Sequence, residues 1–220
     1  GTRDFTTSFM VTKRLEKMSQ MLQEMPLLED AQVAQKLLGE CFGACRLMYN
    51  MRTNRTDWVS GAVEAGELKM RTTFQECTGI VLSDEQWIQA TMPLRKGGLG
   101  MRCGAAHAAA AYLASRTATR DLCKELDNAY VWDLDEPEGG LEAARTAYNS
   151  FVGSSAEISM EALAPGVTSL SQKKLSMKVD ETSSSGLLER LGPAEGSVES
   201  SSGSSCKCMA ASSANRSVEP

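Results

Sequence analysis

The chain has 220 residues, of which 42% are hydrophobic and only 5% aromatic, so a core would be built mainly from Leu, Met, Ala and Cys. Its net charge of −5 is unevenly spread, because residues 1–60 and 61–126 each carry +1 whereas residues 127–220 carry −7. This balance excludes a strongly basic nucleic-acid-binding domain, and the lack of any run of about 18 apolar residues excludes a membrane-spanning helix.

The segment 1–56 is predicted to form a thumb-like helical hairpin. Apolar residues recur at helical spacing over 7–25, and Pro26 ends this pattern because proline cannot continue a helix interior. Asp30 then occupies a typical N-cap position before a second helix over 31–52. Gly39 and Gly43 interrupt this second helix. Glycines four residues apart can allow close contact between helices, but we expect these two to weaken the helix by about 1 kcal/mol each.

The segment 57–132 is predicted to be a helical domain that contains a glycine-rich turn. A helix over 57–77 comes first. Ser83 and Gln86 then fit a capping box, in which the two residues satisfy each other's backbone N–H groups at the start of a helix. That short helix is expected to stop before Pro93.

The turn-rich part of this domain runs from Pro93 to Gly100. An alanine-rich helix is predicted over 104–118, where small side chains would let helices pack closely. A further, separate helix is expected to run through Leu122, Leu126 and Tyr130.

The last third of the chain is predicted to be less ordered. Residues 133–140 form an acidic linker, and residues 141–191 a weak helical segment with helices over 141–151 and 170–191. Residues 192–220 are rich in Ser, Gly, Ala and Glu, so they cannot bury enough apolar surface to offset the entropy of ordering and are predicted to be disordered. The pattern therefore predicts an all-α fold, an irregular bundle of about five to seven helices with a disordered C-terminal tail.

The sequence offers no catalytic or metal centre. His107 is the single histidine, so a histidine metal cage lacks further partners, and a histidine that packs in the core or lies on the surface is favoured. Cys41 and Cys45 lie on one helix face, which suits core thiols as well as ligands, and Cys206 and Cys208 have no matching pair at zinc spacing. We therefore expect no metal and no cofactor.

The seven cysteines indicate a reducing compartment. Residues 1–25 are amphipathic and charged and do not have the pattern of a secretory signal peptide. Reduced thiols are then the expected state, which predicts an intracellular location, nuclear or cytoplasmic.

The basic residues best suited to bind phosphate fall into two groups. One lies around the end of the predicted helix over 31–52. The other flanks the glycine turn 97–100, which lacks the Gly-Lys-Ser/Thr ending of a phosphate-binding loop. If the fold brings both groups together they would face a nucleic-acid backbone; otherwise they are scattered, solvated charges. The six candidates for nucleic-acid binding are Arg46, Arg52, Arg55, Arg95, Lys96 and Arg102.

Three stretches, in this order, resemble the region that follows the catalytic palm of non-LTR retrotransposon reverse transcriptases. They are residues 30–53, 82–102 and 105–115, with a weaker similarity over 172–180 to a segment further downstream in such polyproteins. The most specific string, Pro-x-Arg-x-Gly-Gly-Leu-Gly-x-Arg, begins at Pro93. The order and spacing of the stretches carry the resemblance more than any single one.

The resemblance implies that residues 1–55 lie in or next to the thumb, whose helices contact the template–primer duplex in this family. Arg46, Arg52 and Arg55 would then contact phosphates, which position a nucleic acid without reading its sequence. No catalytic site is implied, because the chain lacks the aromatic-x-Asp-Asp string whose aspartates hold the two metal ions of the palm. The partners implied are an RNA/DNA duplex and the rest of the enzyme, its palm and fingers.

Three interpretations of the function follow. The first is a non-catalytic C-terminal fragment of an RNA-directed DNA polymerase that supports template–primer binding. The second is a helical protein-interaction module, suggested by the methionine-rich helices and the acidic second half. The third is a non-functional relic of such an element, suggested by the glycine interruptions and the polar tail.

Overall fold

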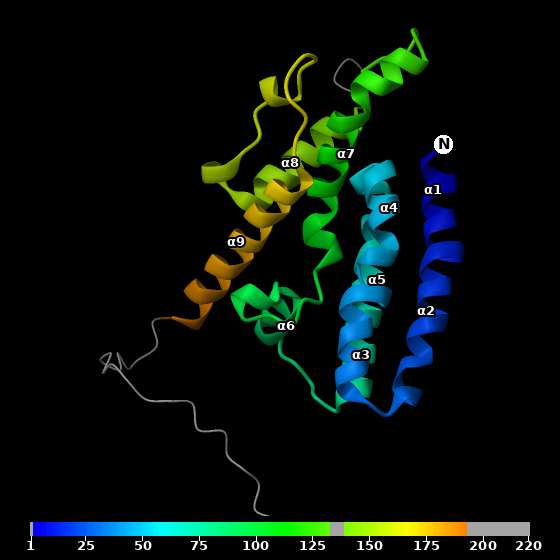
Figure 1. Cartoon of the computed structure of the whole chain (residues 1–220), viewed down its shortest axis with the longest axis vertical. Coiled ribbons are helices and arrows are strands. Elements are labelled where there is room, and N and C mark those ends of the chain that lie inside the picture. Colours follow the sequence, from blue (N-terminus) through cyan, green and yellow to red (C-terminus); the bar gives the residue numbers. More distant parts are fainter. Residues whose placement is uncertain (1, 133–138, 193–220) are drawn as a thin grey trace, which may run out of the picture.

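The computed structural model describes residues 2–132 and 139–192, and every regular element within these ranges is a helix (Figure 1). The predicted all-α class is therefore confirmed. The helices form an irregular bundle in which α1 to α5 lie along one side, α7 crosses the middle and α8 and α9 lie along the other side. The predicted tail, apart from its first residue, and most of the predicted acidic linker lie outside the described residues.

The first helical rod begins when the Thr2 hydroxyl accepts a hydrogen bond from the backbone N–H of Phe5. It ends at Gln23, slightly earlier than predicted. Pro26 lies in the first turn of a short 3-10 helix, where its missing N–H costs no hydrogen bond. The elements in order are α1 (Arg3–Phe9), the π-helical η1 (Met10–Leu15), α2 (Glu16–Gln23) and the 3-10 helix η2 (Met25–Leu28).

The second predicted helix is not continuous, which corrects the expectation that its glycines would only weaken it. Asp30 is the N-cap as predicted, and its carboxylate accepts from the N–H groups of Gln32 and Val33. The chain then breaks at Gly43, where a Cβ atom would lie 2.5 Å from the Leu38 carbonyl oxygen and 2.7 Å from the Met70 sulfur. The Leu38 carbonyl belongs to the backbone, so glycine is the residue that fits this close approach. The elements are α3 (Ala31–Leu37), the π-helical η3 (Leu38–Phe42) and α4 (Cys45–Thr53).

The next two helices follow their sequence signals. α5 (Thr56–Thr78) ends at Gly79, whose φ of +70° is the left-handed conformation that glycine adopts without strain. α6 (Asp84–Thr91) begins with the predicted capping box: the Ser83 hydroxyl accepts from the Gln86 N–H at 3.3 Å, and the Gln86 amide oxygen accepts from the Ser83 N–H at 2.9 Å.

α7 (Gly104–Leu126) is a single helix, which corrects the prediction of one helix over 104–118 and a separate one beyond it. Its second half persists because Arg120 is buried and donates to the carbonyl oxygens of Ala164 and Val167 at 2.8 and 3.3 Å. The same guanidinium lies 5.5 Å from the centre of the Trp132 ring. These contacts come from chain segments that local periodicity does not reveal.

The predicted weak helices near the end of the described chain are well packed. They are α8 (Gly140–Val152) and α9 (Gln172–Leu191), separated by two 3-10 turns, η5 (Ser154–Ala156) and η6 (Glu161–Leu163). Leu141 and Tyr148 of α8 and Val179 of α9 are almost fully buried. Both helices pack against α7 and against each other.

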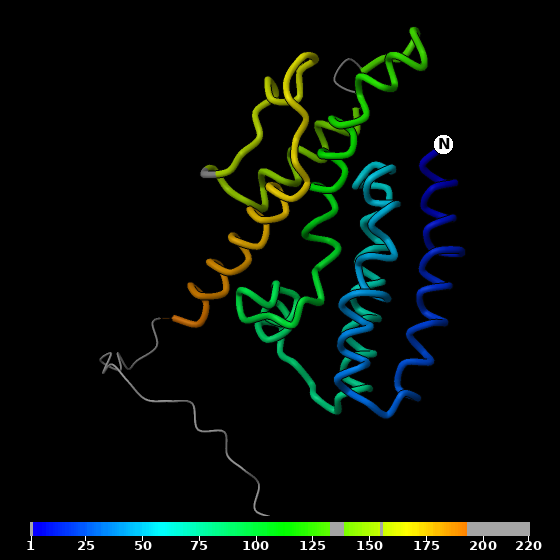
Figure 2. The backbone as a smooth tube through the Cα atoms, in the orientation of Figure 1, coloured from blue at the N-terminus to red at the C-terminus, as the bar shows by residue number. Residues whose placement is uncertain are grey.

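Two hydrophobic cores meet at α7, which lies between the two groups of helices in Figure 2. Ala108 and Ala111 of α7 belong to the first core, whereas Ala110 and Leu113 belong to the second. The buried members of the first core are Met10, Met18, Leu22, Met25, Ala34, Leu38, Leu47, Met51, Val59, Ala62, Val63, Met70, Phe74, Trp87, Ala90, Met101, Ala108 and Ala111. Those of the second core are Ala109, Ala110, Tyr112, Leu113, Ala114, Trp132, Leu141, Ala144, Tyr148, Val152, Ile158, Leu163, Leu175 and Val179.

Candidate anion-binding site

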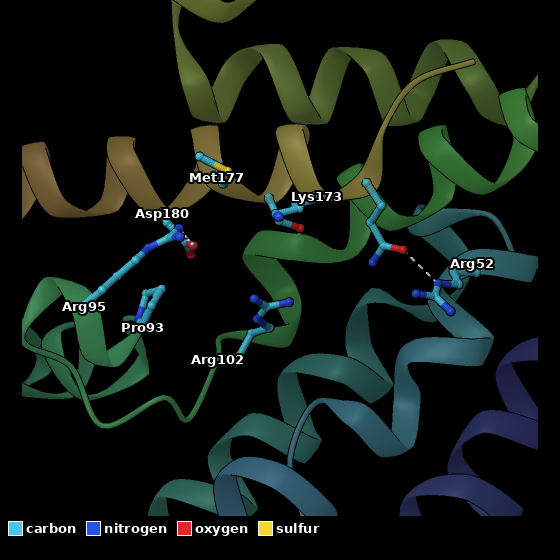
Figure 3. Close-up of a pocket in the computed structure, with 9 residues that line it drawn as sticks. Arg52, Pro93, Arg95, Arg102, Lys173, Met177 and Asp180 are labelled. Carbon is cyan, nitrogen blue, oxygen red and sulfur yellow. Dashed lines mark hydrogen bonds and ion pairs between the residues drawn. The ribbon is translucent and has the colours of Figure 1, made fainter. Parts of the chain in front are cut away.

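A cationic pocket opens where three segments from distant parts of the sequence converge (Figure 3). Its walls are the end of α4, the segment 93–102 that leads into α7, and the first half of α9. The cavity has a volume of about 660 Å³. Its lining residues are Arg52, Pro93, Arg95, Arg102, Gln172, Lys173, Ser176, Met177 and Asp180.

Four cations and one carboxylate line this pocket, so its interior is strongly positive. Arg52, Arg95 and Arg102 are three of the six candidates from the sequence. The fourth cation, Lys173 of α9, was not among those candidates. It lies in the stretch 172–180 that carries the weaker family resemblance, and that stretch was the one available signal for it.

Arg52 stands in the last turn of α4 and links that helix to the beginning of α9. Its Nε donates to the side-chain oxygen of Gln172 at 2.9 Å, the dashed contact in Figure 3. The Gln172 amide nitrogen lies 3.3 Å from the sulfur of Met48, a further contact between the two helices. The guanidinium of Arg52 is therefore oriented at the edge of the pocket by contacts across the two regions.

The glycine-rich turn places two of the arginines. Its chain folds back onto the end of α6, as the N–H groups of Leu99 and Gly100 donate to the carbonyl oxygens of Ala90 and Met92 at 3.0 and 2.9 Å. At Gly98 a Cβ atom would lie 2.0 Å from the Met92 carbonyl oxygen, so only glycine fits there. The segment is thus a tight turn with an arginine at each end.

Arg102 adopts an unusual backbone conformation, with φ at +33°. Positive φ is uncommon for a residue with a side chain, costs about 1–3 kcal/mol and often accompanies a functional site. In Figure 3 the Arg102 side chain rises from the turn toward the space below Lys173 on α9. The strained backbone therefore directs a cation into the pocket.

A buried carboxylate closes one side of the pocket. Asp180 is only 5% exposed, and its Oδ1 lies 3.3 Å from Nε2 of His107, which is 3% exposed. Its Oδ2 lies 3.7 Å from a terminal nitrogen of Arg95, which reaches across from the 3-10 helix η4 (Leu94–Lys96). The predicted packing role of His107 thus takes the form of a buried contact between α7 and α9. In the described part of the chain, its Nδ1 has no hydrogen-bond partner.

Ser176 is the neutral polar residue of the pocket that is most deeply buried. It lies one turn before Asp180 on α9 and is 6% exposed. Its hydroxyl oxygen is inaccessible to solvent and has no hydrogen-bond partner among the described residues. Buried polar groups of this kind are uncommon in folded proteins, and each one calls for an explanation.

The other three candidate cations do not line the pocket. Arg46, at the beginning of α4, donates to the Cys41 carbonyl oxygen at 2.9 Å and lies over the Phe42 ring. Lys96 lies on the same 3-10 helix as Arg95. A hydrogen bond from Lys178 lowers the pKa of the nearby Glu181 carboxyl, and the charges of Lys96 and Arg95 lower it further.

Arg55 is engaged away from the pocket as well. It forms an ion pair of 3.0 Å with Asp57, and its guanidinium lies 5.0 Å from the centre of the Trp58 ring. Both partners are close neighbours in the sequence. The cluster predicted at the end of the second helix therefore separates, and only Arg52 joins the arginines of the turn.

In the described ranges, no group of three or more His, Cys, Asp or Glu residues could hold a metal ion. Within residues 2–132 and 139–192, no helix combines enough length and apolar character to span a lipid bilayer. Comparison of the chain with protein-family models, curated protein sequences and solved structures gave no match.

Proposed function

We propose that the chain is the post-palm part of a non-LTR retrotransposon reverse transcriptase and supports template–primer binding through phosphate contacts of the cationic pocket. One observation carries the proposal. The end of α4 and the glycine turn both belong to stretches that resemble this family, and the fold gathers their cations, Arg52, Arg95 and Arg102, around one opening. Scattered charges would leave these residues on separate faces.

The chemistry of the pocket suits a polyanionic backbone. Guanidinium groups present several N–H donors in one plane and can bind two phosphate oxygens at once. Three of the four cations are arginines, one from the end of α4 and two from the segment 93–102. Contacts of this type fix the position of a duplex and carry no sequence information, which agrees with the accessory role proposed for a chain without palm aspartates.

The test is the salt dependence of duplex binding by the full chain. Fluorescence anisotropy would give the affinity for an RNA–DNA duplex over a series of KCl concentrations. In the triple variant Arg52→Glu, Arg95→Glu and Arg102→Glu, we expect weaker binding and a log–log salt slope reduced by roughly 0.9 for each phosphate contact that is lost.

The matched control changes the same number of charges away from the pocket. Lys69, Lys124 and Arg190 are exposed cations outside residues 1–55, and none lines the pocket. Their replacement by glutamate should leave the slope much closer to that of the parent. Equal loss in the two triple variants, or no loss in the pocket variant when circular dichroism shows that it is folded, would contradict the proposal.

A further inference from the structure

A second cavity opens between the first helical rod and α4, and no residue lines both it and the cationic pocket. Its walls come from α1 and η1 on one side and from the end of α4 on the other. In Figure 1 these segments lie at the same end of the bundle. The volume of about 280 Å³ is close to the lower end of the roughly 300–1,000 Å³ that small-molecule pockets span. The space therefore suits a single ring system.

Aromatic side chains line both walls, so we call this cavity the aromatic cleft, defined by Phe5, Phe9 and Tyr49. Phe5 is 67% exposed and Tyr49 is 68% exposed, while Phe9 is half-buried. Phe5 and Phe9 stack one turn apart, with 6.2 Å between the ring centres and 18° between the ring planes. Large rings are normally more deeply buried than this. The cleft thus offers uncovered aromatic surface to a ring that enters it.

The cleft also contains an unused side-chain amide. Asn50 lies next to Tyr49 on α4 and is only 5% exposed. Its backbone carbonyl accepts from Asn54, but within the described ranges its side-chain amide makes no hydrogen bond. Neither amide atom is among the unpartnered buried atoms that are closed to solvent, so a group in the cleft can reach both. Such an amide requires a ligand that presents a donor beside an acceptor.

Arg14 supplies the charge of the cleft, and none of its described lining residues is a carboxylate. The Arg14 guanidinium lies over the Phe9 ring, 5.2 Å from the ring centre. In the part of the chain that the structure describes, it forms no ion pair and no hydrogen bond. Its N–H groups therefore remain available for an anion. The cleft matches a molecule that joins a flat ring to a negative group.

We propose that the aromatic cleft binds one unpaired nucleotide of a nucleic-acid strand. Its base stacks on the rings of Phe5, Phe9 and Tyr49. The Asn50 amide bonds to an edge of the base, and Arg14 binds the adjoining phosphate. The site goes beyond the proposed function, because the duplex contacts proposed for the cationic pocket use none of these residues.

The chemistry of the cleft favours a nucleotide over an apolar protein segment. Every base has a π-face that stacks on an aromatic side chain. Every base also carries a donor and an acceptor side by side on its Watson–Crick edge, which a side-chain amide can pair with. An apolar side chain would fill the same space but leave the Asn50 amide without a partner, with the desolvation cost of a buried polar group.

Anisotropy titrations of the full chain with two labelled single strands test the stacking. One is a short oligomer of deoxythymidylate, and the other is an abasic oligomer of the same length and charge. We expect the parent to bind the base-bearing strand more tightly. Tyr49→Ala should bind that strand about tenfold more weakly, a factor within the range for the loss of one base–aromatic stack. It should bind the abasic strand like the parent.

Two controls separate stacking from folding. Tyr49→Phe keeps a ring and should retain the affinity for the base-bearing strand. Phe151→Ala removes a ring of α8 that is 40% exposed and does not line the cleft, so it should bind both strands like the parent. Because Tyr49 is largely exposed, circular dichroism should show that its variants are folded.

Asn50→Ala tests the amide separately. We expect it to bind the base-bearing strand about fivefold more weakly, the factor that a typical hydrogen bond contributes. Its affinity for the abasic strand should not change. Its melting temperature should change little, because the amide has no partner to lose among the described residues.

Three results would overturn the assignment. One is equal affinity of the parent for the two strands, and another is a Tyr49→Ala variant that keeps the whole difference between them. The third is a dimer of the chain that Tyr49→Ala dissociates in sedimentation velocity, which would assign the cleft to a second copy.

The triple variant of the cationic pocket distinguishes this site from the proposed function. Base-dependent binding of the single strand, combined with duplex binding that ignores the triple arginine change, supports the cleft and contradicts the proposed function. Duplex binding that the triple change weakens, combined with no base dependence in the parent, supports the proposed function and overturns the cleft.

Discussion

The two hydrophobic cores differ most in their content of methionine. Six of the buried members of the first core are methionines, whereas the second core has none in the part of the chain that the structure describes. The second core contains the aromatic residues Tyr112, Trp132 and Tyr148, whereas those of the first core are Phe74 and Trp87. Methionine is unbranched and adapts to irregular gaps, while aromatic rings have a fixed shape and often a polar atom that needs a partner.

Directional contacts accompany the aromatic residues of the second core. The Trp132 indole N–H donates to the Leu163 carbonyl oxygen at 3.1 Å, and the Tyr148 hydroxyl donates to the Leu175 carbonyl oxygen at 3.5 Å. The pocket lies on the boundary between the two regions. Its α9 wall therefore belongs to the region with the more specific packing, and its α4 wall to the region with the more adaptable core.

The largest expected effect follows from this difference. Replacing Trp132 with alanine should lower the free energy of unfolding by about 3–5 kcal/mol, because the change leaves a cavity and removes the partner of the Leu163 carbonyl. Urea denaturation would measure it. Trp132→Phe is the control that keeps a ring and loses the N–H donor, so its loss should be smaller. A loss below about 1.5 kcal/mol for the alanine variant would mean that the second core adapts as readily as the first.

A smaller effect is expected from a volume-conserving change in the first core. Met51 is fully buried, and Met51→Leu nearly conserves volume, so it should cost less than about 1.5 kcal/mol by the same urea measurement. Met51→Ala, which leaves a cavity, must cost more if the position is packed as described. A leucine variant as damaging as the alanine variant would show that the first core depends on the shape of methionine.

The sequence predicts the parts of this fold that depend on local chemistry. The N-cap at Asp30 and the capping box at Ser83 follow from residues within a turn of each other, and the structure confirms both. The break at Gly43 does not follow from the local pattern, because the close contacts there, to the Leu38 carbonyl oxygen and to the Met70 sulfur of α5, exist only in the folded chain. Periodicity along one helix says nothing about how closely a second helix approaches.

The candidate site shows the same division. Arg95 and Arg102 flank one turn, so their proximity was predictable, whereas Lys173 enters the pocket only because α9 packs beside the turn. Arg55 stays outside the pocket because Asp57 and Trp58 engage it locally, and these neighbours were visible in the sequence. Cations therefore need to be weighed against nearby carboxylates and rings before they are assigned to a binding surface.

The smallest expected effect is a loss of stability at alkaline pH, to which one buried group in each region contributes. Burial, followed by the charge of Glu67 and a hydrogen bond to it, raises the pKa of the Cys103 thiol at the start of α7 from 9.0 to about 12. Burial and then the charge of Glu181 also raise the pKa of Tyr148 in the second core. The folded protein thus holds both protons more tightly than the unfolded chain does, and stability should fall as pH rises above 9.0.

Two variants separate these contributions. Cys103→Ser retains an N-cap for α7, and Tyr148→Phe retains the ring. Each variant should therefore lose less of its free energy of unfolding at alkaline pH than the parent does. Urea unfolding at intervals from neutral pH to about 11 would measure the difference. We expect the serine variant to flatten the curve more, because the thiol has the lower ordinary pKa and its fall begins earlier. Curves that stay parallel to that of the parent would show that neither proton is linked to folding.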